Sequence, residues 1–150
     1  MNWIKITHKD LESALNKDQL DILNAQAFKS AGNPIEEDII ASIVALIRAE
    51  ICANELNLVD EDHSKIPPEL KGAAVRLCVE ALQLRIPTME MTNYQLKQAD
   101  EARKLLERAA NGSLIISRPI SGIRTANYRK SIKIVKKRNS LTNFESMKGL

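Results

Sequence analysis

Apolar residues recur at every third or fourth position through most of the chain up to residue 110, and this spacing is typical of amphipathic helices. The longest stripe runs from Ile35 to Ile51 and is broad enough to lie at the centre of a core. The pattern therefore predicts a mainly α protein, a bundle of about four to five helices. The expected helices cover residues 7–15, 17–28, 34–56, 68–85 and 92–110.

Capping residues and prolines mark the ends of these helices. Thr7 can cap the first helix, with Asp10 in the place of the usual glutamate of a capping box. Pro34 and Pro68 suit the start of a helix, because the first helical position needs no backbone N–H. Pro87 ends the fourth helix, because the residue before a proline is pushed out of helical geometry.

Two further segments lack a helical pattern. Residues 57–66 include three consecutive acids at positions 60–62, and they indicate an acidic, solvated loop. These carboxylates lack the alternating spacing and the distal glutamate of a calcium loop, so we do not expect a cation site there. Residues 114–116 form a short apolar run, which is typical of one strand or an extended segment.

The composition is that of one soluble globular domain. Of the 150 residues, 44% are apolar, 27% are charged and only 3% are aromatic, so the core must be mostly aliphatic. No apolar run approaches the ~20 residues of a membrane span, and the first residues lack the apolar stretch of a signal peptide. We therefore expect a soluble protein that is made in the cytoplasm. Cys52 and Cys78 both fall within apolar helical patterns, and we expect both to be reduced core residues.

A change in charge divides the chain into two parts. Residues 1–117 hold 13 Lys and Arg against 18 Asp and Glu, a balance of −5. Residues 118–150 hold 9 Lys and Arg against Glu145 alone, a balance of +8. This contrast predicts a helical domain at 1–117 followed by a basic C-terminal arm at 118–150.

The arm combines cations with β-branched residues. Ile132 and Ile134 alternate with polar neighbours, a pattern typical of a strand that could add to the sheet edge of a partner. The alternatives are a loosely ordered solvated terminus and direct contact with nucleic acid, which the charge favours although Tyr128 is the one stacking aromatic nearby. The predicted docking residues are Arg118, Ile120, Ile123, Arg124, Tyr128, Arg129, Lys130, Ile132, Lys133, Ile134, Lys136, Lys137 and Arg138.

The sequence shows no group of residues arranged for catalysis. His8 and His63 lie away from any candidate nucleophile, and neither has the spacing of a metal ligand. Neither a Gly-rich phosphate loop nor a nucleophile elbow occurs in the sequence. We therefore expect a protein that is not an enzyme, with no catalytic, cofactor-binding or metal-binding residues.

Several short motifs occur in a characteristic order. They are Ile6-Thr7-x-x-Asp10-Leu11, Ile66-Pro67-Pro68-Glu69-Leu70, Tyr94 in the last helix, and Ala110-Asn111-Gly112 before a short apolar segment. Over residues 4–117 this order resembles the small helical head-completion and head–tail connector proteins of tailed bacteriophages, including the Mu-type group. The family has no catalytic residues to carry over.

The resemblance implies a virion protein at the head–tail junction. Such a subunit forms a ring with copies of itself, commonly twelvefold, and docks beneath the portal protein after DNA packaging. The ring then offers a platform to the next neck or tail protein. A C-terminal extension in these connectors often reaches the portal or a neighbouring subunit. The basic arm here is unusually long, which leaves its partner open and adds non-specific contact with packaged DNA as a further expectation.

A DNA-binding regulatory protein is the alternative hypothesis. The short helices at 7–15 and 17–28 would then act like a helix-turn-helix, and the arm would clamp phosphate groups. Against this hypothesis, the second of these helices begins with Asp18, Gln19 and Asp21, where basic residues that read the DNA groove would be expected.

Overall fold

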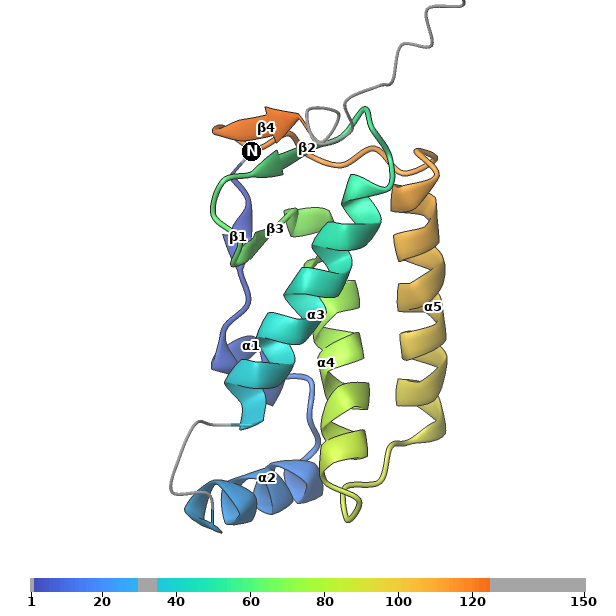
Figure 1. The fold of residues 1–150 in the computed structure, drawn as a ribbon. Helices are drawn as coiled ribbons and strands as arrows, with labels where there is room; N and C mark the ends of the chain where they lie inside the picture. Colours follow the sequence, from blue (N-terminus) through green and yellow to red (C-terminus); the bar gives the residue numbers. More distant parts are fainter. Residues whose placement is uncertain (1, 30–34, 125–150) are drawn as a thin grey trace, which may run out of the picture.

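The computed structural model describes residues 2–29 and 35–124. Within these ranges the fold is mainly α with five α-helices, as the apolar pattern predicts (Figure 1). It also contains two small antiparallel strand pairs, which the pattern does not predict. The elements are β1 (Ile4–Lys5), α1 (His8–Glu12), α2 (Lys17–Lys29), α3 (Ile35–Cys52), β2 (Leu58–Asp60), β3 (Lys65–Ile66), the 3-10 helix η1 (Pro68–Leu70), α4 (Lys71–Arg85), α5 (Asn93–Ala110) and β4 (Gly122–Arg124).

Three long helices form the centre of the fold. Helices α3, α4 and α5 all contact one another, and α2 lies across one end of this group while the strands lie at the other end (Figure 1). Buried alanines on α4 and α5, among them Ala74 and Ala102, allow these two helices to pack closely. The amphipathic stripe of α3 supplies Ile47 and Ile51, which are fully buried.

The buried side chains form two adjoining clusters. One lies towards the strands and includes Ile47, Ile66 and Leu70. The other lies towards α2 and includes Leu11 and Leu82. Because α3 and α4 contribute to both clusters, these two helices join the ends of the fold into one body.

The predicted helix ends agree with the structure to within a residue or so, apart from the ends of α1 and α3, while the predicted start at Pro34 lies outside the described residues. Helix α1 ends at Glu12 and not at residue 15. Thr7 and Asp10 form the predicted capping box of α1. Helix α3 ends at Cys52 and not near residue 56, because asparagine side chains form hydrogen bonds with backbone groups that would otherwise continue the helix. The Asn57 side chain donates to the carbonyl oxygen of Ile51 at 3.1 Å, and Asn54 accepts from the backbone N–H of residue 56 at 3.0 Å.

The strands depart from the sequence-based prediction. The predicted loop at residues 57–66 contains two strands, with β3 paired to β1 and β2 paired to β4, and only the turn at residues 61–64 between them is largely exposed. Residues 114–116 follow the surface of the core without forming a strand; Ile116 is buried and Ile115 is exposed. Strand β4 lies beyond the predicted boundary at residue 117, so the paired backbone of the body continues to Arg124.

Candidate functional site

The structure describes only the first part of the predicted docking arm. Arg118 and Ile120 are exposed, with Ile120 at 78%. Ile123 and Arg124 belong to β4, where their backbones pair with Val59 and Leu58. The other predicted docking residues lie outside the described residues, and they are Tyr128, Arg129, Lys130, Ile132, Lys133, Ile134, Lys136, Lys137 and Arg138. The candidate site is therefore the arm root, residues 114–124, with the body residues that hold it.

Contacts from several distant segments hold the arm root. The indole N–H of Trp3 donates to the carbonyl oxygen of Ser117 at 2.8 Å, and the Ser117 hydroxyl donates to the carboxylate of Glu69. Further along, the backbone N–H of Glu61 donates to the carbonyl oxygen of Ser121 at 3.3 Å, just before β4 begins. The arm thus leaves the body from a fixed position beside β1, β2 and η1.

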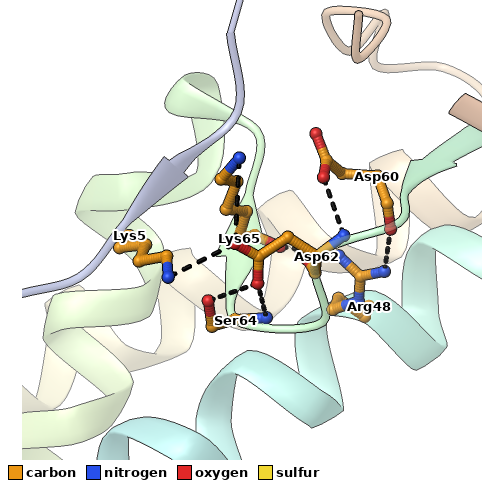
Figure 2. Close-up of polar contacts among 6 residues, drawn as sticks. All are labelled: Lys5, Arg48, Asp60, Asp62, Ser64 and Lys65. Atoms are coloured by element: carbon orange, nitrogen blue, oxygen red, sulfur yellow. Dashed lines mark hydrogen bonds and ion pairs between the residues drawn. The ribbon is translucent and has the colours of Figure 1, made fainter. Parts of the chain in front are cut away.

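Arg48 on α3 organises the segment against which the arm root packs. Only 8% of this side chain is exposed. Its guanidinium donates to the carbonyl oxygens of Asp60 at 2.5 Å, Asp62 at 3.1 Å and Lys65 at 2.8 Å (Figure 2). It also lies 5.5 Å from the ring centroid of Trp3, within the range of a cation–π contact. One side chain therefore fixes the end of β2, the turn after it and the start of β3.

Two of the three acids, Asp60 and Asp62, form hydrogen bonds within the turn between β2 and β3, whereas Glu61 is exposed as expected for a solvated acidic loop. Asp60 is buried, and its carboxylate accepts from the backbone N–H of Asp62 at 2.9 Å. The Asp62 carboxylate accepts from the Ser64 backbone at 3.0 Å and from the Ser64 hydroxyl at 2.6 Å, with Lys5 at 3.3 Å and Lys65 at 3.8 Å (Figure 2). These carboxylates therefore serve the turn itself. Among residues 2–29 and 35–124, no group of three His, Cys, Asp or Glu side chains is placed to hold a metal ion.

The charges of this cluster follow from its contacts. Hydrogen bonds from the Ser64 hydroxyl and backbone, with the nearby Lys5 ammonium, lower the pKa of Asp62 well below its usual range. Burial lowers the pKa of Arg48, which stays charged at neutral pH because a guanidinium starts from so high a value. At neutral pH Asp62 and Arg48 are therefore both charged, and three backbone carbonyl oxygens accept hydrogen bonds from the Arg48 guanidinium.

The lowered pKa of Asp62 predicts a dependence of stability on pH. A depressed carboxyl pKa contributes stability above the unfolded value near about 4, and this contribution is lost as the pH falls through the folded value. We expect Asp62→Asn to lower the free energy of unfolding at pH 7, with the difference from the unchanged protein shrinking steadily below about pH 4. Urea unfolding between pH 2 and pH 7 measures it. The control is Glu61→Gln, which also replaces an acid by its amide but on an exposed neighbour. If the free energy of unfolding varied with pH in the same way for both variants, Asp62 would have no special part in stability.

The structure confirms the prediction for one of the two cysteines and not for the other. Cys78 is buried as expected, and burial raises the pKa of its thiol to about 12. Cys52 is exposed, so the prediction that it is a core residue was wrong: it lies at the end of α3, outside the buried stripe. His63 is exposed, and His8 pairs with Glu36 at the start of α3.

Arg48 was missed by the interpretation of the sequence. A signal was present, because Arg48 lies directly after Ile47 and four residues after Val44, on the apolar stripe of α3. A lone cation in a buried stripe must find acceptors, since an unpaired buried charge is very costly. The partners come from β2 and β3, whose approach to α3 has no local signature.

Comparisons with protein-family models, with curated proteins and with solved structures found no match. In the part of the chain that the structure describes, none of the helices is both long enough and apolar enough to cross a membrane. We therefore infer function from the resemblance of the sequence motifs together with the chain's own contacts.

Proposed function

We propose that this chain is a non-enzymatic structural subunit of the head–tail junction of a tailed bacteriophage. In this proposal, copies of the helical body form a ring beneath the portal protein, continue the DNA channel and offer a platform to the next neck or tail protein. The basic arm docks the subunit onto the portal or a neighbouring copy. The observation that carries the proposal is the built arm root, which holds the start of a strongly basic segment in one position on an acidic body.

Exposed apolar side chains near the arm root support a contact surface there. Leu56 is 86% exposed and Ile115 is 90% exposed, and both line one shallow groove with Arg118. Ile120 is 78% exposed a few residues further along the arm root. Large apolar side chains grouped on a surface mark an interaction site more often than scattered ones do. A partner that covers this groove would also meet the first cation of the arm.

The proposal predicts a separation between folding and assembly. Removing residues 125–150 leaves every described contact of the body in place, so we expect unchanged helical circular dichroism and an unfolding midpoint within a few degrees of the full chain. The same truncation should abolish incorporation into particles, because it removes seven of the nine cations in the arm. Electron microscopy of the protein with purified portal, and particle assembly in cells, measure this effect.

A shorter truncation is the matched control. Removing residues 139–150 keeps all of the predicted docking residues, and we expect normal collars on the portal. If the 125–150 truncation still formed portal-bound collars, the docking role of the arm would be refuted. If the full chain stayed monomeric and showed no affinity for portal, the connector proposal itself would fail.

The contacts of α2 argue against the alternative hypothesis of a DNA-binding regulatory protein. Only 2% of Gln19 is exposed, and its amide donates to the carbonyl oxygen of Glu90 and to the side chain of Gln95. The exposed residues beside it, Asp18 and Asp21, are acidic. A helix that reads DNA presents polar or basic side chains to the groove, whereas this helix end presents acids and ties its glutamine to the body.

A further inference from the structure

A groove opens between α3, α4 and α5, away from the arm root. Its volume is about 410 Å³, and its apolar lining includes Ile43, Leu46, Leu77, Leu84 and Leu106. Leu77 and Leu106 are buried at its base, whereas Leu84 is 78% exposed and Leu46 is 46% exposed. The groove therefore presents unburied aliphatic side chains on two neighbouring helices.

The charged residues of this groove are mostly acidic. Glu50, Glu80 and Glu107 line it together with a single cation, Arg103. Arg103 is already paired with Glu80, and it also contacts Asp100 at 3.2 Å. Among the residues that the structure describes, neither Glu50 nor Glu107 makes an ion pair. The groove thus suits a ligand that carries aliphatic groups together with several positive charges.

Residues 128–138 of the same chain have this chemistry. The segment Tyr-Arg-Lys-Ser-Ile-Lys-Ile-Val-Lys-Lys-Arg holds six cations and four apolar residues without one acid. It begins four residues after Arg124, the last described residue of β4. An extended chain spans about 3.3–3.6 Å per residue, so the ten residues that follow Tyr128 in this segment reach about 35 Å. This length exceeds the ~27 Å of an 18-residue helix such as α3.

We infer that the groove between α3, α4 and α5 is a docking site for residues 128–138 of its own chain in the free subunit. The short tether raises the effective concentration of the segment to about the millimolar range, which favours the subunit's own arm over a separate partner. The apolar side chains of the segment cover Leu46 and Leu84, and its cations face Glu50 and Glu107. This inference goes beyond the proposed function, because it concerns the subunit before it meets any partner.

Limited digestion with trypsin tests the inference, because trypsin cleaves after the lysines and arginines of the segment. The full chain is digested at low concentration, without portal, and cleavage within residues 128–138 is followed by mass spectrometry. We expect Glu50→Gln with Glu107→Gln to speed this cleavage about fivefold, since two exposed charge pairs are lost. We expect Leu84→Ser to speed it roughly tenfold, since a leucine covered by the segment is lost.

A matched control removes two acids from another face. Glu12→Gln with Asp21→Asn alters exposed residues on α1 and α2, and the cleavage rate should not change. Circular dichroism of each variant establishes that the body is folded. Equal cleavage rates in the unchanged protein and the groove variants would overturn the inference. Protection that appears only as the protein concentration is raised would also overturn it, by showing contact between copies. Neither result bears on portal binding, because the assay contains no portal.

Discussion

Replacing Arg48 with methionine is expected to lower the free energy of unfolding by about 3–5 kcal/mol. Methionine keeps much of the apolar stem but leaves the carbonyl oxygens of Asp60, Asp62 and Lys65 without their shared donor. A buried acceptor that loses its partner costs more than the average hydrogen bond contributes, because water does not reach it easily. Urea unfolding followed by circular dichroism measures the change.

Two variants give this prediction its controls. Arg85→Met removes an exposed arginine at the end of α4 and should cost under about 1 kcal/mol. Arg48→Lys keeps the charge but lacks the planar fork that reaches several carbonyls at once, so we expect a loss between those of the other two variants. If Arg48→Met cost no more than Arg85→Met, the three carbonyl contacts would have no part in stability.

The second large effect is expected at Leu82, which is fully buried where α4 meets the cluster near α2. Leu82→Ala should lower the free energy of unfolding by about 2–5 kcal/mol, because it leaves a cavity in packed surroundings. Leu84→Ala removes the same atoms two residues further along the same helix, where 78% of the side chain is exposed. With both variants made in the chain without residues 125–150, so that the arm cannot cover this position, Leu84→Ala should cost less than about 1 kcal/mol. Thermal and urea unfolding compare the pair. Similar losses for both variants would mean that α4 faces the core differently.

The helices of this fold can be predicted from the sequence because each is specified locally. The apolar stripe from Ile35 to Ile51 repeats with the helical period, and Thr7 and Thr92 cap their helices through residues three positions away. The end of α3 is harder to predict, because Asn54 and Asn57 replace helical hydrogen bonds by side-chain bonds that no periodicity reports. The error there is a few residues long.

The strand pairs could not be predicted, because each joins short segments that are distant in sequence. Strand β2 pairs with β4 across α4 and α5 through three residues on each side, and β1 pairs with β3 through two. A segment of that length has no distinctive alternation. The site shares this difficulty: the charge pattern predicts the arm, whereas the Arg48 contacts depend on β2 and β3 lying against α3.

The position of Arg48 has a mechanical consequence for the arm. Tension applied to the chain beyond Arg124 passes first through the β4–β2 pair to Asp60. The carbonyl of Asp60 accepts a hydrogen bond from Arg48 on α3, a helix that contributes to both buried clusters, so the force is passed to α3 and not to a loop. The Trp3 indole N–H also donates a hydrogen bond to the arm root a few residues before β4, at the carbonyl oxygen of Ser117. The short β2–β4 pair is thus supported by the contacts of Arg48 and Trp3. In a subunit attached to its partner through the arm, force on the arm would therefore be distributed over the helical body.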